Sequence, residues 1–129
     1  MTLCGYVFPY GSPACADFAH ASDLIEEINR FGGFCVGGAC YPEGHPESPN
    51  KQADLDGIRK KVDSGCAFLT AQMFFDNNIL YNFLFRLLKH GINVPVVAGI
   101  MPITNERQLK RTFALSGANP PPRFRSALR

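Results

Sequence analysis

The chain has 129 residues, which is the size of one ordinary domain. Its 46% hydrophobic residues, with 11 Phe among them, can fill a core and exclude general disorder. Lys and Arg number 13 against 11 Asp and Glu, and the resulting net charge of +2 gives no electrostatic case for nucleic acid or an anionic membrane as the main partner.

The sequence shows no targeting segment and no cysteine framework. No apolar run approaches the roughly 18 residues of a membrane span, and residues 1–10 lack the basic start of an export signal. We therefore expect a soluble protein of the cytoplasm. The 5 cysteines are odd in number and form no C-x-x-C pair, which favours reduced thiols. A zinc site on Cys4, Cys15 and His20 would match no established ligand spacing, so no metal is expected.

The first part of the chain changes from an irregular to a periodic pattern. Residues 1–16 show no hydrophobic period and are expected to be an irregular segment. Apolar residues then recur every three or four positions over residues 17–31, which predicts a helix that the glycines at 32–33 end. The apolar run over residues 34–40 predicts a strand buried on both faces.

Helices and strands continue to alternate along the rest of the chain. The expected elements are helices over residues 51–64, 77–90 and 104–117 and strands over residues 66–75 and 94–100. Asp76 or Asn77 can cap the second of these helices, and Thr104 can cap the third. Residues 118–129 are rich in proline and are expected to fray.

Buried strands that alternate with amphipathic helices predict an α/β fold with a parallel sheet and right-handed crossovers. Two architectures fit this order, namely an open doubly wound sheet and part of a (β/α)8 TIM barrel. A full barrel takes about 250 residues, so the chain has room for roughly half of one. A sheet of only three strands would leave two exposed edges.

Both architectures bind ligands at the carboxyl ends of their strands. This rule selects residues 41–50, 72–76 and 99–104 as candidate site segments. The first segment is the most unusual, because it places Tyr41, His45 and two carboxylates between prolines that stiffen the backbone. An exposed polar turn and a ligand site both remain possible for this composition.

The helix predicted over residues 51–64 carries a polar stripe. Asp54, Gly57 and Lys61 recur at steps of three and four residues, with Lys60 beside them. A basic stripe next to a polar loop suits a phosphate or pyrophosphate, and Gly57 would allow a close approach. A solvated helix face explains the same pattern, and neither a dinucleotide nor a P-loop fingerprint is present.

Gln72 is a polar residue at the end of an otherwise apolar strand run. A buried amide must find hydrogen-bond partners, which either a ligand or the neighbouring backbone can supply. His90, at a helix end, is expected to interact with the helix dipole and nothing more.

At these residues the sequence resembles methylenetetrahydrofolate reductases. Residues 37–48 read GGACYPEGHPES, which is similar to the Y-P-E-x-H-P-E signature of that family. Further similar segments follow in the order and spacing of the family, at residues 53–55, 60–66, 70–76 and 99–103. The resemblance extends from about residue 20 to residue 117.

The resemblance implies an FAD-containing (β/α)8 barrel that reduces 5,10-methylenetetrahydrofolate to 5-methyltetrahydrofolate. NAD(P)H, or another electron donor in some relatives, would first reduce the flavin, which would then pass hydride to the folate. Residues 17–117 are accordingly expected to form a partial TIM-barrel domain.

The resemblance also assigns roles to individual positions. The FAD contacts of the family match His20, Ala21, Tyr41, His45, Ser48, Asp54, Gly57, Lys60 and Lys61. Gln72 matches an amide that faces folate and nicotinamide, and Gln108 matches a second folate contact. Many relatives have Asn in place of Gly57, some have Arg in place of Lys60, and Tyr is frequent in place of His20.

Other parts of the family pattern have no counterpart in these residues. The amino-terminal strands are missing, and with them the Glu taken as general acid and an Arg-Gly-Asp segment that tunes the flavin, so no catalytic residue is assigned. The chain is therefore expected to be a truncated, middle-to-late part of a barrel. Two functions stay open. The chain either belongs to a flavin reductase, with the isolated 129 residues expected to be inactive because they lack the general acid, or is a non-catalytic half-barrel that binds FAD weakly or only self-associates as a homo-oligomer.

Overall fold

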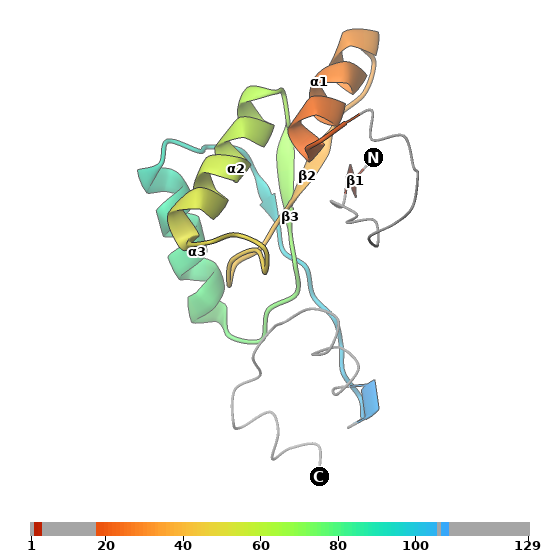
Figure 1. Ribbon diagram of the computed structural model, residues 1–129. Coiled ribbons are helices and arrows are strands. Elements are labelled where there is room, and N and C mark those ends of the chain that lie inside the picture. Colours follow the sequence, from red (N-terminus) through yellow and green to blue (C-terminus); the bar gives the residue numbers. More distant parts are fainter. Residues whose placement is uncertain (1, 4–17, 106, 109–129) are drawn as a thin grey trace.

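The computed structural model describes residues 2–3, 18–105 and 107–108, and these form one sheet with helices beside it (Figure 1). The elements in chain order are β1 (Thr2–Leu3), α1 (Ala21–Phe31), β2 (Gly37–Cys40), α2 (Lys51–Asp63), β3 (Phe68–Ala71), α3 (Asn77–Lys89) and β4 (Val96–Val97). The predicted alternation of helix and strand is thus confirmed. Within the described ranges, no helix has the length and apolar character needed to cross a membrane.

The sheet has one more strand than the sequence predicts. Thr2 and Leu3, which were expected to be irregular, pair with Gly37 and Gly38 as strand β1. The predicted irregular residues 4–16, most of the predicted fourth helix and the predicted frayed tail lie outside the described residues.

The four strands are all parallel and follow the chain order β1-β2-β3-β4. A doubly wound sheet reverses its strand order at a switch point, and no reversal occurs among these strands. Parallel strands in sequential order with crossovers of one hand place their helices on one face. The fold is therefore part of a (β/α)8-type barrel, and Figure 1 shows α2 and α3 together on one side of β2 and β3.

The core lies between the sheet and this layer of helices. Leu69 and Ala71 of β3 are buried, whereas Phe68 and Thr70, which alternate with them, are only partly buried. This pattern arises because alternate residues of a strand point to opposite faces. The buried cluster comprises Ile25, Val36, Cys40, Leu55, Ile58, Cys66, Leu69, Ala71, Phe83, Leu87 and Ile92. The periodic apolar residues predicted over 17–31 extend beyond the buried part of the first helix. Phe31 is 78% exposed, and Phe18 precedes the helix.

The start of α3 follows the capping chemistry of the sequence. The Asp76 carboxylate accepts a hydrogen bond from the Asn78 backbone N–H at 2.8 Å, which confirms Asp76 as the cap of α3. The helix for which Thr104 is the predicted cap lies mostly outside the described residues. Near its predicted start, the Asn105 side chain accepts from the Gln108 backbone N–H at 2.8 Å.

Candidate functional site

The loop after β2 folds into two consecutive turns at the carboxyl end of the strand. The Tyr41 carbonyl accepts from the Gly44 N–H and the His45 carbonyl accepts from the Ser48 N–H, each at 3.0 Å. Gly44 has φ of +105°, a conformation that favours glycine. The rings of Tyr41 and His45 meet edge to face with centroids 4.6 Å apart. The sequence pattern thus produces an ordered aromatic–imidazole pair at the strand end.

The His45 ring is oriented by its own loop. Its Nδ1 accepts a hydrogen bond from the Glu47 backbone N–H at 3.2 Å. The neutral imidazole therefore carries its proton on Nε2, which leaves that nitrogen as a donor.

Asp54, in the first turn of α2, faces this loop from a half-buried position. Burial raises the pKa of its carboxyl above the ordinary 3.8. A hydrogen bond from the His45 backbone and electrostatic interactions with His45, Lys61 and Arg86 lower that pKa again in part. The Asp54 carboxyl group therefore lies within electrostatic range of His45, Lys61 and Arg86.

Lys61 extends from α2 to the sheet. Its Nζ donates to the Ala39 carbonyl of β2 at 2.9 Å, from a partly buried position. An ammonium group has three N–H donors, and this is the one bond that the described residues give it. The remaining donors can bind an anion near the strand end.

The surface of α2 between Asp54 and Lys61 is open. A Cβ built on Gly57 would meet no described atom within 4 Å. A ligand can therefore approach the helix backbone there, as the sequence predicted for a phosphate group.

Gln72 follows β3 directly and satisfies part of its amide locally. Its backbone N–H donates to the Cys40 carbonyl at 2.8 Å, which extends the pairing of β2 and β3 by one residue. Its Oε1 accepts from the Met73 N–H at 3.1 Å. Of the two partners considered from the sequence, the neighbouring backbone rather than a ligand therefore satisfies the amide oxygen. Among the described residues, none accepts a hydrogen bond from its Nε2.

The other sequence-predicted residues lie apart from this cluster or are engaged elsewhere. His20 is exposed at the start of α1, where its backbone N–H donates to Asp23 at 2.9 Å, and Ala21 follows it as the first helical residue. The Gln108 Oε1 accepts from the Thr104 backbone at 3.1 Å and from the Thr104 hydroxyl at 3.2 Å. The structure thus gives the Gln108 amide a local partner.

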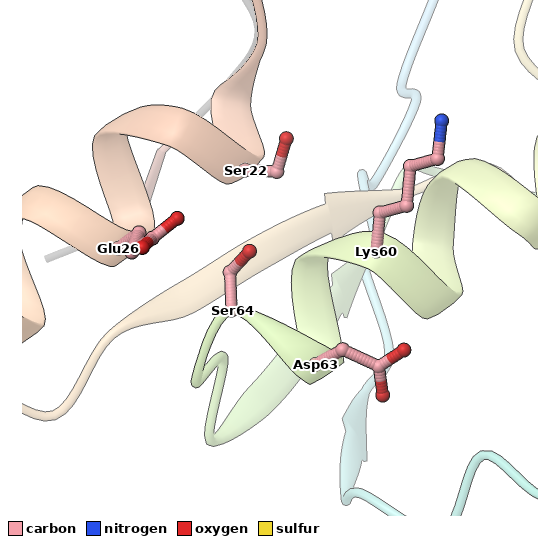
Figure 2. Close-up of a pocket in the computed structure, with 5 residues that line it drawn as sticks. All are labelled: Ser22, Glu26, Lys60, Asp63 and Ser64. Atoms are coloured by element: carbon pink, nitrogen blue, oxygen red, sulfur yellow. The ribbon is translucent and has the colours of Figure 1, made fainter.

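Lys60 does not join Lys61. It lines a hollow of about 440 Å³ between α1 and α2, together with Ser22, Glu26, Asp63 and Ser64. Figure 2 shows Ser22 and Glu26 on α1 across from Ser64, with the Lys60 amine pointing away from the Asp63 carboxylate. The predicted basic stripe is therefore split, because Lys61 reaches the sheet while Lys60 extends outward.

Sequence reasoning missed Arg86 of α3. One guanidinium nitrogen donates to the Pro42 carbonyl at 3.0 Å, and the guanidinium carbon lies 5.9 Å from the centre of the Phe83 ring. The signal that could have found it is its isolation, since Arg86 is the only charged residue between positions 77 and 88.

The described residues hold no group of three or more His, Cys, Asp or Glu side chains placed to bind a metal ion. Cys4 and Cys15 of the rejected zinc set lie outside the described residues. Of the cysteines that the structure describes, Cys35 is exposed and Cys40 and Cys66 are buried and unpaired.

Comparison with known proteins gives one consistent family. The family model described as methylenetetrahydrofolate reductase matches residues 10–129. Methylenetetrahydrofolate reductase 2 of Saccharomyces cerevisiae is 37% identical over 121 residues, which cover 91% of this chain and 20% of that protein. The 5,10-methylenetetrahydrofolate reductase of Escherichia coli is 38% identical over 92 residues, covering 71% of this chain and 31% of that protein.

A solved structure shares the fold at lower identity. It is a protein from Clostridium thermocellum described as binding two copies of 5-methyl-5,6,7,8-tetrahydrofolic acid. The two structures align with a TM-score of 0.60 at 18% sequence identity, over 83% of this chain and 38% of that one. The chain spans about a third or less of the length of the two curated relatives above.

Proposed function

The chain belongs to the methylenetetrahydrofolate reductase family, and from that premise we propose that it provides the flavin-holding part of an FAD-dependent methylenetetrahydrofolate reductase. The reaction reduces 5,10-methylenetetrahydrofolate to 5-methyltetrahydrofolate with electrons from NAD(P)H. The observation that carries the proposal is the meeting of Tyr41, His45, Asp54 and Lys61 at the end of β2.

The residues of this cluster fit the parts of a dinucleotide cofactor. The unused N–H donors of Lys61 suit the anionic pyrophosphate, and the Asp54 carboxylate is an acceptor for ribose hydroxyl groups. The open surface at Gly57 admits phosphate oxygens close to α2. When bound, FAD supplies the hydride chemistry, accepting a hydride from the nicotinamide and delivering one to the folate.

Gln72 would orient the substrate beside the cofactor. Cys40 pairs with Ala71, so Tyr41 and Gln72 leave the sheet at the same level on neighbouring strands. The Gln72 Nε2 can donate to a polar edge of the folate or nicotinamide. The tetrahydrofolate bound by the Clostridium thermocellum protein of similar fold supports a folate as the substrate class.

A second candidate function is a non-catalytic, FAD-binding half-barrel. It is favoured by the open edges of the sheet, since β1 and β4 each have one strand neighbour among the described residues.

Flavin binding and turnover by the purified 129-residue chain separate these functions. We expect the protein to retain FAD after desalting, and oxidation of NADH with menadione as acceptor would then support the reductase. Retention without turnover would leave the second candidate, and no retention at saturating FAD would overturn both. Lys61→Ala should weaken FAD binding about tenfold or more, or about 1.4 kcal/mol. Lys51→Ala, at an exposed position of the same helix, should leave binding unchanged.

A further inference from the structure

We propose that Arg86 is a positioning residue of the flavin site, which holds the 41–50 loop from α3 and so keeps the Tyr41–His45 pair in place at the end of β2. The inference rests on the proposed function, because it assigns a role within that same site.

The contact of Arg86 with the loop is direct and well placed. It donates to the carbonyl of Pro42, which is buried and follows Tyr41 in the chain. The bond joins residues 44 positions apart, at a partly buried point. A hydrogen bond from a charged donor is stronger than one between neutral groups, so this bond is a specific restraint on the start of the loop.

The guanidinium group is itself oriented by α3. Its Nε donates to the Asn82 carbonyl at 3.4 Å, and its carbon lies 5.9 Å from the centre of the Phe83 ring. Phe83 is 1% exposed and belongs to the core. The contacts with α3 therefore orient the guanidinium group, and one of its terminal nitrogens reaches the loop.

The charge of Arg86 acts on the same site. Together with His45 and Lys61 it lowers the pKa of Asp54 against the effect of burial. Arg86 thus favours the ionised form of the Asp54 carboxylate, which would accept hydrogen bonds from the cofactor ribose. The guanidinium group itself binds the backbone carbonyl of Pro42.

A matched control exists on α2. Arg59 also donates to a backbone carbonyl between helices, that of His90, at 2.7 Å, and it pairs with Asp63 of its own helix at 3.4 Å. Neither of these two contacts reaches the 41–50 loop. Replacement of either arginine by Met keeps most of the aliphatic stem and removes the hydrogen bond. The two variants therefore differ in whether the lost contact reaches the loop.

The experiment compares FAD affinity, the visible circular dichroism of bound flavin and hydrogen exchange in the 129-residue chain. Arg86→Met should weaken FAD at least tenfold, alter the flavin spectrum and speed exchange of the Gly44 and Ser48 amides. Arg86→Lys should restore part of the affinity, since it keeps the charge without the fork. Arg59→Met should lower the melting temperature by a similar amount and leave FAD affinity within about twofold.

The outcomes separate this inference from the proposed function. Equal FAD affinities for Arg86→Met and Arg59→Met at equal stability would show a merely structural role and overturn the inference. If the unaltered chain binds no FAD, the proposed function fails and the flavin role of Arg86 with it. Amide exchange then still decides whether Arg86 holds the loop.

Discussion

Asp54 is a carboxyl group whose burial opposes its ionisation. Its pKa is raised above 3.8, so the folded chain binds the proton more tightly than the unfolded chain does. The stability gained in this way is complete below 3.8 and is lost as the pH rises through the folded-state pKa. Asp54→Asn should therefore raise the free energy of unfolding of the flavin-free chain at about pH 7, with the gain vanishing toward pH 3.

Urea unfolding at a series of pH values measures this difference. Asp56→Asn is the control, because Asp56 is exposed on the same helix. At about pH 7, Asp56→Asn should change the free energy of unfolding less than Asp54→Asn does. A loss of stability in Asp54→Asn at neutral pH would mean that the favourable charges around Asp54 outweigh its burial.

Cys40 should be the least reactive of the described thiols. Burial raises the pKa of the Cys40 thiol to about 12, against a smaller lowering by Lys61. At about pH 8 this thiol therefore stays in its unreactive, protonated form. Iodoacetamide should label the exposed Cys35 well before Cys40, as followed by mass spectrometry of peptides over time. Equal labelling rates would contradict this burial.

The site residues that sequence reasoning brought together share one local origin. Tyr41, His45, Asp54 and Lys61 lie on one loop and the helix after it, so their spacing alone indicates a common neighbourhood. The sequence does not predict the role of Arg86, because its partner Pro42 is 44 positions away and no local pattern marks the pair. Lys60 was grouped with Lys61, but adjacent helix residues point about 100° apart.

At the scale of single elements, α2 offers a test of what Gly57 does. A Cβ there meets no described atom, and Ala is a better helix former than Gly by about 0.8–1.0 kcal/mol. Gly57→Ala should therefore stabilise the flavin-free chain by about 0.5–1 kcal/mol, measured by urea unfolding. If α2 did not form, the substitution would have no such effect.

Gly65→Ala is the matched opposite case. Gly65 has φ of +97°, and a Cβ there would collide with the Asn29 side chain. Asn29 donates from its Nδ2 to the Ser64 carbonyl at 2.9 Å and to the Gly65 carbonyl at 3.2 Å, so the collision would disturb the contact of α1 with the end of α2. This variant should be destabilised, and equal signs for the two substitutions would contradict the geometry.

Helices were predicted more accurately than strands, and the reason is physical. The predicted helix over residues 51–64 is observed at Lys51–Asp63, because local residues mark both ends: the Asn50 side chain caps its start, and Gly65, with φ of +97°, follows its end. The predicted strand over residues 34–40 shrinks to Gly37–Cys40, because a strand extends only where a neighbour pairs with it. β1 has two residues and no period, so its pairing partner alone defines it.

At the scale of the whole molecule, the alternation of helices and strands predicts a parallel sheet in sequential order. It does not predict what covers or pairs with the edges of that sheet. Val96 packs against the core beside the helices, so Val97 points to the opposite face, level with Thr70. Val97 is 52% exposed, at the β4 edge of the described sheet. An apolar side chain and an unpaired strand edge in one place favour pairing with another chain.

The 129-residue chain should therefore self-associate as its concentration rises, which sedimentation velocity can measure. Val97→Lys places a charge at the β4 edge, on the face of the sheet opposite the helices. It should shift the distribution of sedimenting species toward monomer. Leu88→Lys is the control, because Leu88 is 60% exposed on α3 and makes the same change of polarity on a helix. A monomer throughout the concentration range would contradict the prediction. If Leu88→Lys had a larger effect than Val97→Lys, the association would involve the helices, because Leu88 lies on α3 and Val97 lies at the β4 edge.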